Sequence, residues 1–338
     1  MQSQFLARVS ARQRVFLTRT AALDRMCGPL CEAVLDLPGP AATLADLARS
    51  NLLLVPLDRH GEWYRYHQLF RDMLLAELRR LEPELIPVLR HRAASWCLRN
   101  GLPEEALEYS MAAGDIDAAA GLVETLAVPT YWQGRVATVQ RWFRWLEDRG
   151  GIEGHPMALV LASLLSALTA RPTDAERWAD VVDRWQRGDV AWPGDPAAEA
   201  WAAVLQALLC RHGVDQMRAD ADQAARRFAA HNIVAPAPAL FQGLARILSG
   251  DLAGGDVSLE NAVNVGAAAG APEIVPIALA EPSLVAMARG EWGRAGAFAE
   301  GACAALRRAG IEESYATPLV CAVRARTALR RGDLTTAR

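Results

Sequence analysis

The chain has 338 residues, of which 52% are hydrophobic, 22% charged and 7% aromatic, and its net charge is −3. This length and composition exclude a disordered chain and a disulfide-held miniprotein, and they favour helices over strands. All 36 basic side chains are arginine, because the sequence contains no lysine. Phosphate-binding loops of the G-x-x-x-x-G-K-[ST] pattern, Schiff-base chemistry and Ser-Lys catalysis all need lysine, so the chain cannot complete any of them alone.

The six cysteines show no C-x-x-C spacing and have no histidine at the distances typical of metal ligands. We therefore expect buried, reduced thiols and no metal site. The sequence has neither a signal-peptide pattern nor an uncharged stretch as long as the ~20 residues that span a bilayer. These observations predict a cytoplasmic protein without membrane contact, and the slightly negative charge argues against general nucleic-acid binding.

The first predicted elements are helical. Apolar residues recur at three- and four-residue spacings over residues 16–35, and Gly28-Pro29 interrupts them. This pattern predicts two short helices that meet at a bend. Thr43 is then the expected N-cap of a third helix, which extends to about Asn51.

The hydrophobic period changes after this helix. Residues 52–57 and 62–66 have the pattern of two strands, and residues 58–61 form a tight turn between them. The helical period returns at His67. Helices followed by a hairpin and another helix predict a winged-helix-like domain, which we assign to residues 1–82.

From residue 83 onward no strand pattern is found, and Ala-rich amphipathic segments follow one another between Gly and Pro turns. A short motif recurs among them: an apolar residue, two spacers, Gly, an acid and another apolar residue. Gly can end one helix in a left-handed conformation, and the acid suits the start of the next. The motif therefore predicts helical hairpins, with turns at Gly114-Asp115, Gly250-Asp251, Gly290-Glu291 and Gly332-Asp333.

The last three of these glycines are 40 and 42 residues apart, and Gly213 lies 37 residues before Gly250. A period near 40 with two helices per unit is typical of a stacked α-solenoid. The expected fold is therefore mainly α: a winged-helix unit followed by a tetratricopeptide-like superhelix over residues 83–338. The sequence ends six residues after Gly332, so we expect a superhelix truncated at its C-terminus, within a longer protein.

Several segments resemble a known family, the MalT-like transcriptional regulators, which are large ATP-binding LuxR-type proteins of the STAND class of signalling ATPases. The part that follows their ATPase core is similar to residues 16–34, 47–57 and 63–70. The start of their tetratricopeptide-like superhelix is similar to residues 93–96, 101–106 and 113–115. The resemblance is specific over about residues 5–147 and is carried by the repeat pattern beyond them.

The resemblance implies a four-part protein with an ATPase, a winged helix, a superhelical sensor and a C-terminal helix-turn-helix. This chain corresponds to the middle two parts, so ATP or ADP would bind outside it, and DNA only through the missing C-terminal domain. The superhelix would receive a small-molecule inducer or a regulatory protein, and the activated protein would self-associate. Two alternatives stay open: a free-standing tetratricopeptide scaffold, and the regulator-like region of a bacterial serine/threonine kinase. We expect no enzyme activity, since the histidines stand singly and no catalytic or metal-binding arrangement is found.

His67 is the most specific candidate site residue. Its surroundings resemble the Met-His-Asp element of related STAND switches, where the histidine contacts the β-phosphate of ADP. Here Tyr66 and Gln68 replace the flanking residues of that element. An imidazole at a helix N-terminus is suited to phosphate, although a histidine that only caps or packs is the competing interpretation. Arg65 and Arg71 flank the same junction and are given no role.

Aromatic side chains are the candidate ligand contacts of the superhelix. Trp142 and Trp145, together with Tyr131 and Trp132, could line a concave surface of the kind that stacks on sugar rings. Aromatics at helical spacing are more often core residues, and this interpretation stays open beside the first.

Overall fold

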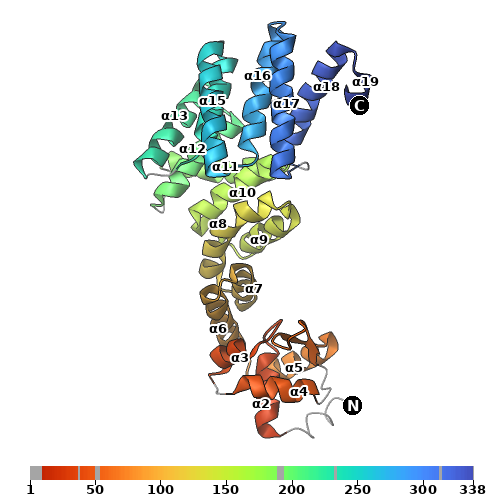
Figure 1. Ribbon diagram of the computed structural model, residues 1–338. Helices are drawn as coiled ribbons and strands as arrows, with labels where there is room; N and C mark the ends of the chain where they lie inside the picture. The colour runs from red at the N-terminus through yellow and green to blue at the C-terminus, as the bar shows by residue number, and fades with distance from the viewer. Residues whose placement is uncertain are drawn as a thin grey trace. The chain divides into compact units, whose positions relative to one another are not determined.

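The computed structural model describes residues 10–36, 39–49, 54–188, 194–231, 234–311 and 314–337. Helices make up most of this described part (Figure 1). The chain divides into two compact units, Met1–Leu126 and Ala127–Arg338, and the division falls within helix α8 (Ile116–Trp132). The mainly α-helical fold predicted from the sequence is confirmed.

The first unit has the element order expected of a winged helix. Among its described residues, three helices precede a two-stranded antiparallel hairpin, and a longer helix follows it. These elements are α2 (Ala11–Thr20), α3 (Gly28–Leu35), α4 (Pro40–Arg49), β1 (Leu54–Pro56), β2 (Tyr64–Tyr66) and α5 (Gln68–Leu81). Leu54 pairs with Tyr66, and Val55 with Arg65. Residues 50–53, which include the predicted end of the third helix and the start of the first strand, lie outside the described residues.

The hairpin turn is held by Asp58. Its carboxylate accepts hydrogen bonds from the backbone N–H groups of His60, Glu62 and Trp63, at 2.9, 3.1 and 2.6 Å. These bonds, led by the one from Glu62, lower the pKa of the Asp58 carboxyl. The turn that the sequence predicted at residues 58–61 therefore forms because one acidic side chain satisfies three backbone donors.

The third helix begins earlier than predicted. Thr43 lies inside α4, which begins at Pro40, so the expectation that Thr43 is its N-cap is wrong. Proline at the first helical position has its φ already set for a helix and has no N–H to satisfy. Gly39 precedes it with a φ of +83°, which lets the chain turn into the helix at that point.

The core of the first unit runs beyond the winged helix. Leu17, Met26 and Leu74 are fully buried among residues of α2, α3 and α5. The same core continues into α6 (Leu85–Arg99) and α7 (Pro103–Ala113). The domain boundary predicted at residue 82 therefore lies inside this compact unit, and it stays a prediction.

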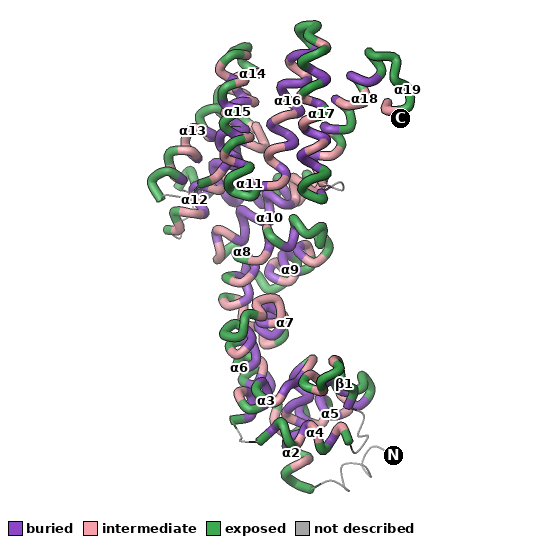
Figure 2. The backbone as a smooth tube through the Cα atoms, viewed as in Figure 1, coloured by how far each residue is buried: buried purple, intermediate pink, exposed green. Residues whose placement is uncertain are grey.

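The second unit is a succession of helices joined by short turns. Its elements after α8 are α9 (Val136–Asp148), η1 (Ile152–Gly154), α10 (Pro156–Leu168), α11 (Pro172–Gln186), α12 (Pro196–Leu209), α13 (Val214–Ala230), α14 (Ala237–Leu248), α15 (Leu252–Ala269), α16 (Ile274–Ala288), α17 (Trp292–Ala309), α18 (Thr317–Arg331) and α19 (Leu334–Ala337). Successive helices pack as hairpins, and α10, α12, α14, α16 and α18 also contact one another in that order. Buried residues follow the facing sides of the paired helices (Figure 2). This arrangement of pairs and stacked first helices is an α-solenoid.

The predicted Gly-acid turns are present. Gly114, Gly250, Gly290 and Gly332 have φ values of +78°, +87°, +75° and +78°, a region that other residues adopt poorly. The following acid caps the next helix in three of them, where Asp115, Asp251 and Asp333 accept from backbone N–H groups. The sequence motif therefore marks real helix ends, for the physical reasons that predicted it.

A buried hydroxyl repeats the same period. Ser163 of α10 donates to the carbonyl O of Ala175 at 2.7 Å, and Ser283 of α16 donates to that of Ala295 at 2.8 Å. The two serines are three 40-residue periods apart in the sequence. The positions one and two periods after Ser163 are Ala203 and Gly243, both buried. Small residues at this position let the two helices of each hairpin approach closely.

The prediction for the cysteines holds only in part. All six are free thiols, and Cys27, Cys31, Cys97 and Cys303 are buried. Cys321 is exposed and Cys210 is partly exposed, so for these two the expectation of burial is wrong. Cys321 lies on the exposed side of α18, one residue after the fully buried Val320.

Candidate functional site

His67 lies where β2 ends and α5 begins. It is the N-cap residue of α5, yet its side chain makes no capping hydrogen bond and is exposed. Gln68 and Leu69 beside it are also exposed, and the Gln68 amide lies 3.4 Å from a carboxylate oxygen of Asp72. The imidazole is therefore accessible to a partner outside the chain, and its role as a phosphate contact stays a prediction.

The two arginines near this junction differ in their surroundings. Arg71 Nε donates to the carbonyl oxygens of Ala21 at 3.2 Å and Leu23 at 3.1 Å, and its guanidinium pairs with Asp24 at 2.5 Å. Arg65 is exposed on the hairpin. Arg71 therefore holds the fold together, whereas Arg65 shares the exposed side of the junction.

Apolar side chains are also exposed around this junction. Val55 is paired with Arg65 across the hairpin, and Val55, Leu57 and Leu69 are exposed to 37, 45 and 76%. Alternation along β2 places Arg65 on the face opposite the buried Tyr64 and Tyr66. The outer face of the hairpin and the start of α5 thus present apolar and basic groups together.

The four aromatic residues singled out in the superhelix do not form one surface. Trp142 is 1% exposed and belongs to the core, and Trp145 packs under the guanidinium of Arg149, 4.2 Å from its ring centroid. Tyr131 and Trp132 line a cavity instead. The core interpretation is therefore correct for Trp142, and the ligand-surface interpretation is kept only for Tyr131 and Trp132.

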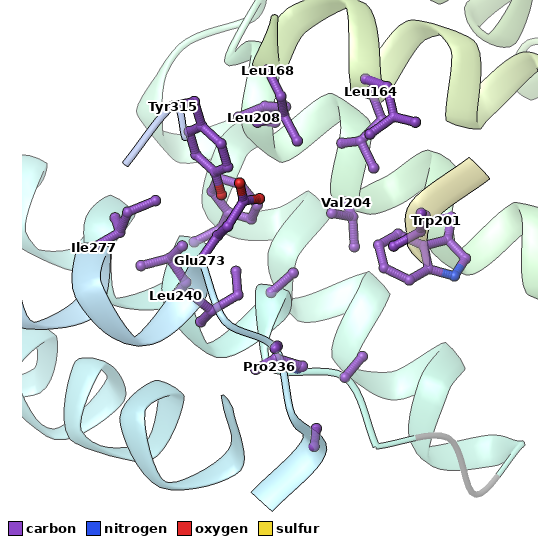
Figure 3. A pocket seen from close by; sticks show the side chains of 18 of the residues that line it. Leu164, Leu168, Trp201, Val204, Leu208, Pro236, Leu240, Glu273, Ile277 and Tyr315 are labelled. Atoms are coloured by element: carbon purple, nitrogen blue, oxygen red, sulfur yellow. The ribbon is translucent and has the colours of Figure 1, made fainter. Parts of the chain in front are cut away.

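This cavity lies within the second unit and has a volume of about 310 Å³. Its wall comes from α8, α10, α12, α14, the end of α15, the start of α16 and the segments that precede α14, α16 and α18. Figure 3 shows most of the lining side chains. The lining is almost entirely apolar, with Val128, Leu164, Leu165, Leu168, Val204, Leu208, Val234, Ala235, Pro236, Ala237, Leu240, Phe241, Leu244, Ala269, Ala271, Ile274 and Ile277. Tyr131, Trp132, Trp201, Glu273 and Tyr315 complete it. Such a volume and lining are typical of small-molecule sites.

One carboxyl group stands in this apolar wall. Glu273 is 6% exposed and precedes the first turn of α16, but its side chain does not cap that helix. It points into the cavity instead, toward the hydroxyl of Tyr315 (Figure 3). Burial raises the pKa of Glu273 to about 7, and a hydrogen bond from Tyr131 partly offsets this rise. Burial also raises the pKa of both tyrosines.

Glu273 was not among the residues that the sequence singled out. The available signal was a single acid after an uncharged run, since residues 261–272 contain no charged side chain. A charged residue in such a run is often exposed, and only the packing of distant helices around it shows that it is buried.

Neither a metal-binding cluster nor a membrane-spanning helix is found in the described part of the chain. Among the described residues, no group of three or more His, Cys, Asp or Glu side chains is arranged to hold a metal ion. No helix in the described part of the chain is both long and apolar enough to cross a membrane.

A winged helix followed by a superhelix of helical hairpins defines this chain as a two-part, mainly α-helical repeat protein. Comparison with known proteins shows which proteins this chain is similar to. Residues 2–86 match the MalT winged helix domain family. The chain is 35% identical over 113 residues to the HTH-type transcriptional regulator MalT of Klebsiella pneumoniae, and this stretch is 33% of the chain and 12% of that protein.

Similarity extends to a kinase and to a solved structure. The serine/threonine-protein kinase PknK of Mycobacterium tuberculosis is 33% identical over 111 residues, which are 33% of this chain and 10% of the kinase. A STAND protein with a tetratricopeptide repeat sensor from Pyrococcus horikoshii has the same fold, with a TM-score of 0.64 and 13% identity over 99% of this chain and 50% of that one. The aligned part thus spans about a tenth of the curated relatives. The resemblance to MalT-like STAND regulators is confirmed, by sequence over the winged helix and as a fold over the whole chain.

Proposed function

We propose that this chain is the sensor and relay segment of an ATP-dependent, LuxR-type transcriptional regulator. The observation that carries the proposal is the 310 Å³ cavity of the superhelix, with a buried carboxyl in its wall, in a chain that also has a MalT-type winged helix. A cavity of this kind is a site for an effector, and a winged helix next to a nucleotide switch is a means to transmit its presence.

In the proposed mechanism, effector binding shifts an equilibrium between two states of the whole protein. In the resting state, His67 contacts the phosphate of ADP held by an ATPase domain outside the chain. The exposed residues Val55, Leu57 and Leu69 give the winged helix an apolar surface for that domain. Effector binding releases this contact, and the ATP-bound protein then self-associates and binds DNA through a further domain.

We propose that the chain itself has no catalytic role and binds no nucleotide tightly. It has no lysine to complete a phosphate-binding loop. ATP hydrolysis by a clean preparation of these 338 residues would contradict this part of the proposal.

The cavity as an effector site is tested by thermal shift of the chain against a panel of small metabolites. A ligand that binds only the folded protein at about 100 times its Kd adds about 2.7 kcal/mol of stability and raises the Tm. Leu208→Phe places a larger side chain in the cavity wall and should abolish the shift. A panel without any cavity-dependent ligand, or a shift that persists in Leu208→Phe, would argue against the sensor role.

The similarity to PknK supports a second candidate, in which the same two units regulate a kinase. The flanking coding sequence discriminates between the candidates. A phosphate-binding loop upstream and a helix-turn-helix downstream would support the transcriptional regulator. An upstream kinase domain would support the kinase. If the flanking sequence encodes none of these domains, that result would support a free-standing scaffold that binds a protein partner.

A further inference from the structure

We propose that the cavity takes a mostly apolar small molecule that carries a single protonated amine, which pairs with Glu273. This inference rests on the proposed role of the cavity as an effector site and deepens it by naming the chemical class of the ligand.

The apolar lining of the cavity indicates that most of the ligand is apolar. Apart from Glu273, Tyr131 and Tyr315, the hydrogen-bonding side chains among the lining residues are the two indole N–H donors of Trp132 and Trp201. Each ligand hydroxyl buried without a partner would cost on the order of 1–3 kcal/mol, so a sugar or another polyhydroxylated molecule fits this cavity poorly. An alkyl or aryl body instead covers apolar wall that otherwise faces water.

The buried carboxyl decides the charge of the ligand. Glu273 forms no ion pair in the part of the chain that the structure describes. A buried carboxylate without a cation is strongly unfavourable, and an anionic ligand beside it would add repulsion. A ligand ammonium group supplies the missing positive charge and can donate to the carboxylate.

The shape of the cavity gives the ligand an orientation. Figure 3 shows the carboxylate of Glu273 beside Tyr315 in one part of the cavity, and Trp201 in another, with Val204 between them. The ammonium group would therefore lie near Glu273, where the tyrosine rings also favour a cation. The apolar end would extend toward Trp201 and Leu164.

The experiment compares probes that differ only in their terminal group: phenylpropylamine, phenylpropanol and phenylpropanoate. Binding to the 338-residue chain is measured by calorimetry and by tryptophan fluorescence, because Trp132 and Trp201 line the cavity. We expect the amine to bind at least about tenfold more tightly than the alcohol and the acid to bind most weakly.

Two matched variants locate the charge effect. Glu273→Gln keeps the shape of the side chain and removes its charge, and it should weaken amine binding at least about tenfold, so that the preference for the amine over the alcohol is lost. Glu281→Gln is the control, since Glu281 is a partly buried glutamate of the same helix that does not line the cavity. It should bind the amine as the parent chain does.

The pH dependence is a second readout. The titratable groups that face the cavity are Glu273 from the start of α16, Tyr131 from α8 and Tyr315 from the segment before α18, and the linings from α10, α12 and α14 are not titratable. With the pKa of Glu273 near 7, amine binding should strengthen from pH 6 to pH 8, and alcohol binding should not change.

The outcomes separate this inference from the proposed function. Equal binding of amine and alcohol, both lost in Leu208→Phe, would overturn the amine assignment and keep the cavity as a ligand site. Amine binding that survives both Glu273→Gln and Leu208→Phe would occur elsewhere and would overturn the inference. No binding by any of the three probes would also overturn it, while the metabolite panel would still test the proposed function.

Discussion

The guanidinium of Arg71, at the start of α5, is fixed to the chain between α2 and α3, with its Nε 3.1 Å from the carbonyl O of Leu23. The same nitrogen lies 3.2 Å from the carbonyl O of Ala21. One side chain therefore ties α5, which begins at Gln68, to the segment that connects α2 and α3.

Arg71→Met should destabilise the first unit by about 1–3 kcal/mol, because it leaves these carbonyl oxygens without their donor. Chemical denaturation would measure the change in the free energy of unfolding. Hydrogen exchange of the backbone amides of α2 and α5 would show that the change lies in the first unit. Arg65→Met is the matched control: Arg65 is exposed, and its replacement should change stability by less than about 0.5 kcal/mol. Equal effects of the two substitutions would contradict the structural role of Arg71.

His67→Ala should leave the fold of the chain intact, with a stability change below about 0.5 kcal/mol, since the side chain is exposed and makes no capping bond. In a full-length protein that carries the ATPase domain, the same substitution should loosen ADP and raise basal signalling. Retained nucleotide, measured after purification of the full-length variant, is the readout. Unchanged ADP retention would count against His67 as a phosphate contact.

Glu273 should make stability depend on pH in an unusual direction. Its pKa is raised from 4.5 to about 7 in the folded state, so between these values the folded chain binds more protons than the unfolded chain. The titration of Glu273 therefore leaves the free energy of unfolding highest below about pH 4.5 and lowers it as the pH rises through 7. The loss for this 6% exposed side chain is roughly 3 kcal/mol.

Unfolding of the parent chain and of Glu273→Gln at pH 5 and pH 8 measures this effect. The variant should be the more stable of the two at pH 8, and the difference should shrink at pH 5. Glu260→Gln, at an exposed position of α15, should follow the parent chain at both pH values. A constant difference between parent and Glu273→Gln would contradict the raised pKa.

The buried serines predict additive effects. Ser163→Ala and Ser283→Ala each remove one hydroxyl-to-carbonyl hydrogen bond and should each cost about 0.5–1.5 kcal/mol. They lie in separate helical hairpins, so the double variant should lose the sum of the two. Thermal unfolding of the two single variants and the double variant checks both points, and a neutral Ser283→Ala would show that its bond adds nothing.

Cys321 should react first with a thiol reagent in the native chain, because it is the exposed cysteine. Cys27, Cys31, Cys97 and Cys303 should react only after unfolding, since they are buried. Mass spectrometry after brief labelling identifies the modified residue. Cys321→Ser should remove the fast phase, and a fast phase that persists would place the reactive thiol elsewhere.

Local signals predicted most of the fold. The hairpin turn depends on Asp58 and its own neighbours, and the helix ends depend on glycines with positive φ, so the residues that decide each feature are adjacent in sequence. Thr43 failed as a predictor because Pro40 could start the helix three residues earlier. The local sequence does not fix where a helix begins when two nearby residues can each start it.

The candidate site was much less predictable. Tyr131 and Trp132 were found by residue type, but Trp142 at a similar helical spacing is buried in the core. Glu273 became a candidate only when helices from distant parts of the sequence closed around it. Burial of a single acid is a property of the assembled repeats, and a one-dimensional period cannot show it.

The origin of the cavity wall has a consequence for how the superhelix melts. In a repeat protein each unit contacts mainly its neighbours, so units can open independently from one end. The cavity, however, draws its wall from α8 through to Tyr315. A ligand bound in the cavity would contact several helical hairpins at once, although each hairpin otherwise contacts mainly its neighbours. Occupancy would therefore convert a graded, repeat-by-repeat unfolding into a single sharp transition.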